Sequence, residues 1–238
     1  YIRDDFVDVM VAGGAESPLS QLTYGAFAFI KTMSQQEPAL ACRPFDRLRD
    51  GFVMGEGAAS VIVEELEHAR ARGAHIYAEV LGYSLNNDAF HMTSPLPTGA
   101  SCMRAMRESL ADAQLEPGQI DYINAHASST QLNDSTETMS IKEVFGAHAH
   151  KIPVSGTKAY TGHPLGATGA IEAVIGSLAL DRSWVPPTLN WENPDPACDL
   201  DVVPEHGRDL EINCLLSNSF GFGGINACII LGRAPAVD

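Results

Sequence analysis

Short apolar runs rich in β-branched residues alternate with helical patterns along nearly the whole chain, and this alternation constrains the fold more than any other feature. Strands that alternate with helices are typical of α/β proteins, in which helices cover the sheet. The sequence therefore predicts an α/β fold with largely covered sheets. We expect strands over residues 7–14, 60–66, 75–85, 120–126, 151–156, 214–220 and 226–232, and helices over 18–33, 67–73, 101–113, 134–146 and 165–181.

The charge balance is strongly acidic. The chain has 238 residues, with 15 Lys and Arg against 30 Asp and Glu, which gives a formal net charge of −15. This balance argues against nucleic acid and anionic membranes as partners, although Arg43, Arg47 and Arg49 are candidates for a local basic patch. No apolar run approaches the roughly 18 residues needed to span a bilayer, so no membrane segment is expected.

Cysteine usage favours a reducing compartment. The five cysteines are odd in number and show no CxxC spacing, which favours free thiols over a disulfide framework or a metal site. The chain opens on Tyr1 and enters a strand-like run almost at once, so we expect a further segment upstream of it.

The predicted strand over residues 120–126 ends on His126 and is followed by the small hydroxyl residues Ser128 and Thr130. Side chains just beyond a strand end project into the crevice where α/β sheets bind ligands. Two simpler interpretations stay open at this point. His126 could be a structural histidine, and the hydroxyls could cap the next helix, a role that Asp134 or Ser135 is also able to fill.

A second histidine, His163, directly precedes an Ala- and Gly-rich helical pattern. A helix N-terminus disfavours the protonated imidazole, and a neutral imidazole can donate its N–H to a developing oxyanion, as in the known case of triosephosphate isomerase. Lys158 lies five residues earlier and Glu172 nine residues later. A buried Lys–Glu pair would indicate a functional site, while the alternative is that both side chains are solvated.

Residues 217–226, which read SNSFGFGGIN, combine two phenylalanines, Phe220 and Phe222, with three glycines that include Gly223. Glycines permit a positive φ and close backbone approach, which suits an oxyanion hole or a mobile turn. The pattern lacks GxGxxG and GxxxxGK[ST] spacing, so a nucleotide site is not expected.

In this order and spacing, the blocks NAHASST, SGTKAYTGHPLGATGAIEA and NSFGFGGIN resemble the signature blocks of β-ketoacyl-acyl-carrier-protein synthases of the elongating, synthase II-like type. The stretches DVMVAGGAES, RPFDRLRDGFVMGEGAASVIVEELEHARARGAHIYAEV and WVPPTLNWENPDPACDLDVVP are also similar, so the resemblance covers essentially the whole chain. It implies a thiolase-like α/β fold of αβαβα layers, usually a cytoplasmic homodimer. Residues 1–72 would then be the remainder of the N-terminal half, and residues 73–238 the complete C-terminal half.

The resemblance also implies roles for the candidate residues. His126 and His163 would contact the malonyl thioester carbonyl, and Lys158 and Glu172 would order His163. The other predicted substrate contacts are Ser128 and Thr130, which would bind the phosphopantetheine arm, and Phe220, Phe222 and Gly223, with Phe222 as the gate for the acyl chain. The implied activity is decarboxylative condensation of malonyl-acyl carrier protein with an acyl thioester in fatty-acid elongation, without metal or bound cofactor, because the carrier protein delivers the phosphopantetheine.

The sequence departs from the family pattern at three points. Ala127 stands where Gly is common, and Ile225 stands where Thr or His is common. The family's nucleophilic cysteine belongs to a helix upstream of the first strand here, so we expect no nucleophile in this chain and no activity from it alone. Cys102, at the start of a predicted helix, is the one cysteine of this chain that is a candidate for the nucleophile. A thiolase is disfavoured because residues 217–226 lack that family's second cysteine. A non-catalytic chain-length-factor-like subunit and a polyketide synthase ketosynthase domain remain alternatives.

Overall fold

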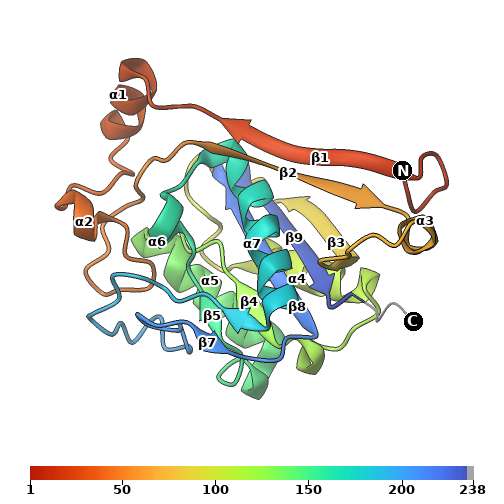
Figure 1. Ribbon diagram of the computed structural model, residues 1–238. Coiled ribbons are helices and arrows are strands. Elements are labelled where there is room, and N and C mark those ends of the chain that lie inside the picture. The colour runs from red at the N-terminus through yellow and green to blue at the C-terminus, as the bar shows by residue number, and fades with distance from the viewer. Residues whose placement is uncertain (235–238) are drawn as a thin grey trace.

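The computed structural model describes residues 1–234 and confirms the predicted α/β content (Figure 1). Helices and strands alternate along most of the chain, as the apolar runs predict. The strands are β1 (Val9–Glu16), β2 (Gly57–Glu64), β3 (Glu79–Asn87), β4 (Tyr122–Asn124), β5 (Val154–Ser155), β6 (Trp184–Val185), β7 (Arg208–Asp209), β8 (Cys214–Gly221) and β9 (Ile225–Gly232). The helices are α1 (Gln21–Phe29), α2 (Pro38–Ala41), α3 (Leu66–Ala71), α4 (Ala100–Asp112), α5 (Gln131–Phe145), α6 (Lys158–Thr161) and α7 (Thr168–Arg182).

The main sheet has five strands in the order β3-β9-β8-β4-β5. β8 is the central strand, and β4 lies between β8 and β5 and is parallel to both, pairing Ile123 with Val154 of β5 and with Leu216 of β8. β8 and β9 form an antiparallel pair closed by the glycine-rich turn, and β3 pairs with β9 at the edge. β1 and β2 form a separate two-stranded antiparallel sheet.

The elements stack in layers around α7 (Figure 1). One side of α7 packs against β1 and β2, and the other packs against β8 and β9. α4 packs on β3 and β9 and contacts α5. Close packing requires small residues here, because a Cβ on Gly14 of β1 would lie 2.9 Å from the carbonyl oxygen of Gly166. The layers therefore follow the order sheet, helix, sheet, helices, which corresponds to four successive layers of the predicted αβαβα stack.

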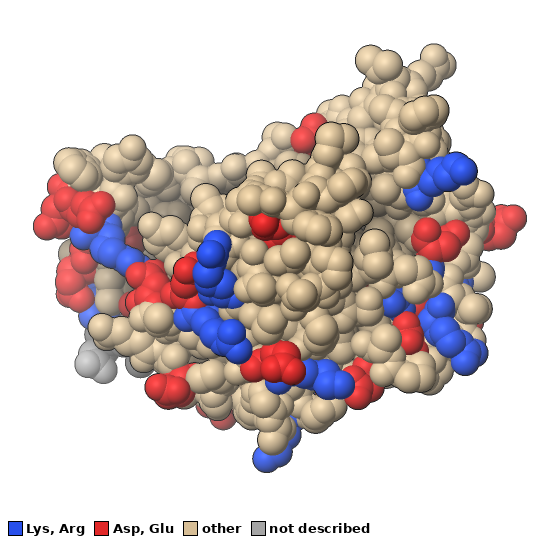
Figure 2. Space-filling view, turned by 180° about the vertical axis from the view of Figure 1, so that it is seen from behind, with Lys and Arg blue, Asp and Glu red and all other residues tan. Residues whose placement is uncertain are grey.

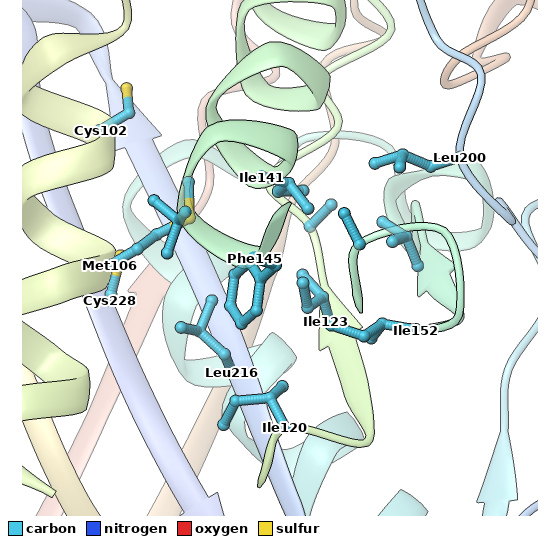
Figure 3. Packing of buried hydrophobic residues seen from close by; sticks show 14 of the residues in the cluster. Cys102, Met106, Ile120, Ile123, Ile141, Phe145, Ile152, Leu200, Leu216 and Cys228 are labelled. Carbon is cyan, nitrogen blue, oxygen red and sulfur yellow. The ribbon is translucent and has the colours of Figure 1, made fainter. Parts of the chain in front are cut away.

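The largest core lies where α4 and α5 meet the five-stranded sheet (Figure 3). Met106 of α4 and Ile123 of β4 are fully enclosed, and Phe145 of α5 is nearly so. Burying such a side chain contributes about 1.5–3 kcal/mol relative to leaving it exposed. This core fixes β4 and α5 rigidly, and the loop between them carries His126.

Several predicted boundaries are wrong for local reasons. The helix predicted over 18–33 covers only Gln21–Phe29, because Lys31 adopts a positive φ of 55° and Met33 instead forms a bridge with Phe52. The strand predicted over 75–85 runs from Glu79 to Asn87. The helix predicted over 134–146 begins at Gln131. Within residues 1–234, no helix combines the length and the apolar character needed to cross a membrane.

Candidate active site

His126 lies two residues beyond β4, at the edge of the sheet where the parallel strands β4 and β5 end. The loop that carries it begins with Ala125, whose N–H donates to the Ser155 carbonyl at 3.0 Å. The imidazole is 5% exposed, and its Nδ1 atom is enclosed without a hydrogen-bond partner among the described residues. The sequence places His126 at a strand end, and the structure agrees.

Glu137 of α5 anchors the backbone around His126, and sequence reasoning missed it. Its two carboxylate oxygens accept the N–H groups of His126 at 2.9 Å and Ala127 at 2.8 Å. The side-chain amide of Asn218 in β8 donates to the same carboxylate at 3.0 Å. Burial raises the pKa of Glu137, and these donors oppose the rise by stabilising the anion. Ala127, where the family more often has Gly, is held at a positive φ of 42° by this arrangement.

His163 lies in the turn between α6 and α7, and its backbone pairs with the segment that leads into β2. Its N–H donates to the Val53 carbonyl at 2.7 Å, and its carbonyl accepts the Gly55 N–H at 3.1 Å. Gly55 is required there, since a Cβ would lie 2.4 Å from the Thr161 carbonyl oxygen. The ring meets Phe52 edge-on at a centroid distance of 5.5 Å.

The two histidines belong to one site. Their ring centroids are 5.2 Å apart, with the planes at 77°. Burial, reinforced by the positive charge of Lys158, lowers the pKa of His163 to about 3. The same two causes, with a contribution from His163, lower the pKa of His126. Both imidazoles are therefore neutral at neutral pH, and burial rather than the helix N-terminus is the main cause.

Lys158 and Glu172 form a buried ion pair. The alternative, that both side chains are solvated, is therefore wrong. The Lys158 Nζ atom is 2.6 Å from Glu172 Oε1 and donates to the His126 carbonyl at 2.5 Å. Burial raises the pKa of Glu172 to about 7, and Lys158 opposes the rise. Through Lys158, α7 is thus connected to the loop that carries His126.

Ser128 and Thr130 lie on the same loop, with their hydroxyl oxygens 3.0 Å apart. Thr130 is the N-cap of α5, because its hydroxyl accepts the Asn133 N–H at 3.3 Å. Asp134 and Ser135, the predicted caps, lie inside the helix; Asp134 is fully buried and accepts the Phe45 N–H at 2.9 Å. The capping interpretation is therefore correct for Thr130. The Ser128 hydroxyl does not cap a helix.

The glycine-rich turn between β8 and β9 borders the histidines. Phe220 is buried with its ring 6.0 Å from that of His126, while Phe222 is 44% exposed and stacks on Phe27 at 6.0 Å. Gly223 adopts a positive φ of 80°, and its N–H donates to the Met92 carbonyl at 2.7 Å. Phe222 is thus attached to a turn that lies against the loop after β3.

None of the five cysteines has the environment of a nucleophile. All are free thiols, and burial raises the pKa of Cys42, Cys102 and Cys198 to about 12. Burial also raises the pKa of Cys214 and Cys228. Cys102, the candidate nucleophile of this chain, packs into the core beside Met106 (Figure 3). Within the described chain, no group of three or more His, Cys, Asp or Glu residues is placed to hold a metal ion.

Two of the three candidates for a local basic patch are buried in ion pairs and do not belong to a surface patch. Arg49 is enclosed and donates to Asp195 at 2.6 Å, and Arg43 lies buried 3.7 Å from Asp46. Basic side chains on the surface are interspersed with acidic ones on the face shown in Figure 2. Arg49 instead fastens the loop before Gly51 to the start of α5, since its Nε donates to the Thr130 carbonyl at 3.1 Å.

Comparisons with known proteins give a consistent result. Residues 1–69 match the family described as "Beta-ketoacyl synthase, N-terminal domain", and residues 77–192 match "Beta-ketoacyl synthase, C-terminal domain". A 3-oxoacyl-[acyl-carrier-protein] synthase 2 from Coxiella burnetii is 51% identical over 98% of this chain and 56% of its own length. One from Synechocystis is 49% identical over 96% of this chain and 55% of its own length. The chain thus spans little more than half the length of these relatives.

Solved structures agree with the thiolase-like α/β class predicted from the sequence. A ketosynthase of a type II polyketide system, determined with its acyl-carrier protein and bound to a hexaketide, superposes with a TM-score of 0.96 at 42% identity. The superposition covers 98% of this chain and 58% of the ketosynthase chain. A β-ketoacyl synthase from Burkholderia phymatum superposes with a TM-score of 0.93 at 43% identity, over 98% of this chain and 57% of that chain.

Proposed function

Because the chain belongs to the β-ketoacyl synthase family and resembles its elongating, synthase 2 members, we propose that it carries the decarboxylating half of a Claisen-condensing acyltransferase. The reaction joins malonyl-acyl carrier protein to an acyl thioester in fatty-acid chain elongation. The observation that carries the proposal is the pair of neutral imidazoles, His126 and His163, with centroids 5.2 Å apart. Residues 1–72 would complete an N-terminal half, and residues 73–238 would form the C-terminal half.

The geometry supports a division of labour between these residues. When the malonyl group loses CO₂, the electrons of the breaking C–C bond pass into an enolate. Imidazole N–H groups directed at the thioester oxygen stabilise that negative charge without a net positive charge in the site. The enolate carbon then attacks the acyl thioester carbon, a carbon–carbon bond forms, and the thiolate leaves.

The remaining residues serve delivery of the substrates. Ser128 and Thr130 would bind the phosphopantetheine arm of the acyl carrier protein, the expected partner. Phe220, Phe222 and Gly223 would border the acyl chain, with Phe222 as its gate. No metal or resident cofactor is required for this chemistry, since decarboxylation drives carbanion formation. We also propose a cytoplasmic homodimer, with the nucleophilic cysteine outside this chain, so that residues 1–238 alone are inactive.

The alternative, a non-catalytic chain-length-factor-like subunit, would not require two neutral histidines held by Glu137, Lys158 and Glu172. This network therefore favours the enzyme.

Replacing His163 in the full-length protein tests the proposal. His163→Ala should lower malonyl decarboxylation and condensation about 100-fold or more, as expected for the loss of an oxyanion donor. Self-acylation of the nucleophile should persist. His75→Ala is the matched control, because His75 is 64% exposed on the surface and should leave both rates unchanged. Condensation within a few-fold of wild type in His163→Ala would refute the assigned role.

A further inference from the structure

Thr168, the first residue of α7, makes a direct contact with His163. Its Oγ1 atom lies 3.0 Å from His163 Nδ1, and the threonine side chain is buried. The sequence gives no hint of this contact, because a threonine at the start of a helix usually has a local structural role. The contact joins α7 to the imidazole ring itself rather than to its backbone.

The direction of this hydrogen bond follows from which protons need an acceptor. A neutral imidazole carries a single N–H, on Nδ1 or on Nε2. The Thr168 hydroxyl makes no other hydrogen bond within residues 1–234. If Nδ1 carried the proton and donated to Thr168, the buried hydroxyl proton would be left without an acceptor, which is costly. If the hydroxyl donates to Nδ1, both groups are satisfied and the imidazole proton resides on Nε2.

The position of Thr168 on α7 adds a second observation. Thr168 and Glu172 are one helical turn apart, so they lie on the same face of the helix. Thr168 contacts His163, while Glu172 pairs with Lys158, which donates to the His126 carbonyl. One face of α7 therefore contacts His163 directly and reaches the His126 loop through Lys158.

We propose that Thr168 is a positioning residue whose hydroxyl fixes His163 as the Nε2–H tautomer and holds the orientation of its ring. The Nδ1 side faces Thr168 of α7, and Nε2 is left free to donate to the substrate. The catalytic consequence of this assignment rests on the proposed function, in which His163 donates to the thioester oxygen. The assignment of the tautomer does not depend on the proposed function.

The test uses three variants of the full-length protein. Thr168→Val removes the hydroxyl with little change of shape, and Thr168→Ser retains a hydroxyl. Ser177→Ala is the matched control, because Ser177 lies on the same helix and its hydroxyl donates only to the Ala173 carbonyl at 2.8 Å. Magic-angle-spinning ¹⁵N spectra of histidine-labelled protein distinguish protonated from unprotonated ring nitrogens, and His163→Ala identifies the signals of His163.

In wild type, Thr168→Ser and Ser177→Ala, we expect His163 Nε2 to be protonated and Nδ1 to be a hydrogen-bonded acceptor. In Thr168→Val, the Nδ1 signal should lose its hydrogen-bond shift, and kcat for malonyl decarboxylation should fall about 10-fold with KM within about 2-fold. A protonated Nδ1 in wild type would overturn the inference, as would a Thr168→Val protein with unchanged spectrum and kcat. If His163→Ala itself leaves decarboxylation intact, the proposed function fails, while the spectra still decide the tautomer.

Discussion

Replacing Glu137 by glutamine removes one acceptor from the site while keeping the size of the side chain. In the native protein the two carboxylate oxygens accept one backbone N–H each, from His126 at 2.9 Å and from Ala127 at 2.8 Å. A glutamine amide offers only one oxygen. In either orientation of that amide, one buried N–H therefore faces an NH₂ group instead of an acceptor.

The size of the effect follows from this count. A hydrogen bond to a charged group contributes about 1.5–3 kcal/mol, and a buried donor left without a partner costs about 1–3 kcal/mol. These ranges describe overlapping parts of the same loss, so we expect Glu137→Gln to lower the free energy of unfolding by about 2–4 kcal/mol. The loop will also relax, and a displacement of about 1 Å at His126 can lower kcat about 100-fold.

Urea unfolding of the full-length protein measures the first effect, and malonyl decarboxylation measures the second. Glu143→Gln is the matched control, since Glu143 lies on the same helix but is exposed. Exposed substitutions of this kind usually change the free energy of unfolding by less than about 0.5 kcal/mol. If Glu137→Gln and Glu143→Gln give the same unfolding free energy, the carboxylate does not anchor the loop and the reasoning is wrong.

Two further experiments test other parts of the proposal. Phe222→Ala should impair acyl loading or its chain-length selectivity more than malonyl decarboxylation, because Phe222 is half-exposed on the glycine-rich turn and stacks on Phe27. Equal losses in both steps, measured by separate loading and decarboxylation assays, would show that it is not a gate. Incubation of residues 1–238 with an acyl-carrier thioester should give no stoichiometric adduct in peptide mass analysis, because the buried thiols are protonated. A single fully acylated residue would contradict this, whether it is Cys42, Cys102, Cys198, Cys214 or Cys228.

The sequence predicts those features that depend on nearby residues. Apolar runs locate the strands, and the position of His126 at the end of one of them is visible without any tertiary information. The neutral state of His163 is also predicted, although through the helix N-terminus, whereas burial is the larger cause. Burial depends on segments that come from elsewhere in the chain, so a local pattern cannot supply it.

Features that depend on distant partners were missed or misassigned. Arg49 looks like a surface charge in the sequence, but its carboxylate partner Asp195 lies 146 residues away. Glu137 lies in a helix with ordinary polar spacing, and only the fold reveals that its carboxylate faces the His126 loop. A charged residue on a helix is normally solvated. No local signal marks these two as exceptions.

The position of β4 between β5 and β8 has a consequence for the order of folding. β4 has only three residues, and its partner strand β8 is far away in the sequence, with Tyr122 paired to Leu215. Closing a loop of roughly 90 residues costs about 4 kcal/mol of chain entropy beyond a constant. Parallel pairings of such high contact order form slowly. The His126 loop, which continues from β4, therefore receives its contact from Phe220, and its anchor Glu137 the contact from Asn218, only after β8 has docked, so a chain released during synthesis before β8 emerges has both histidines but an incomplete site.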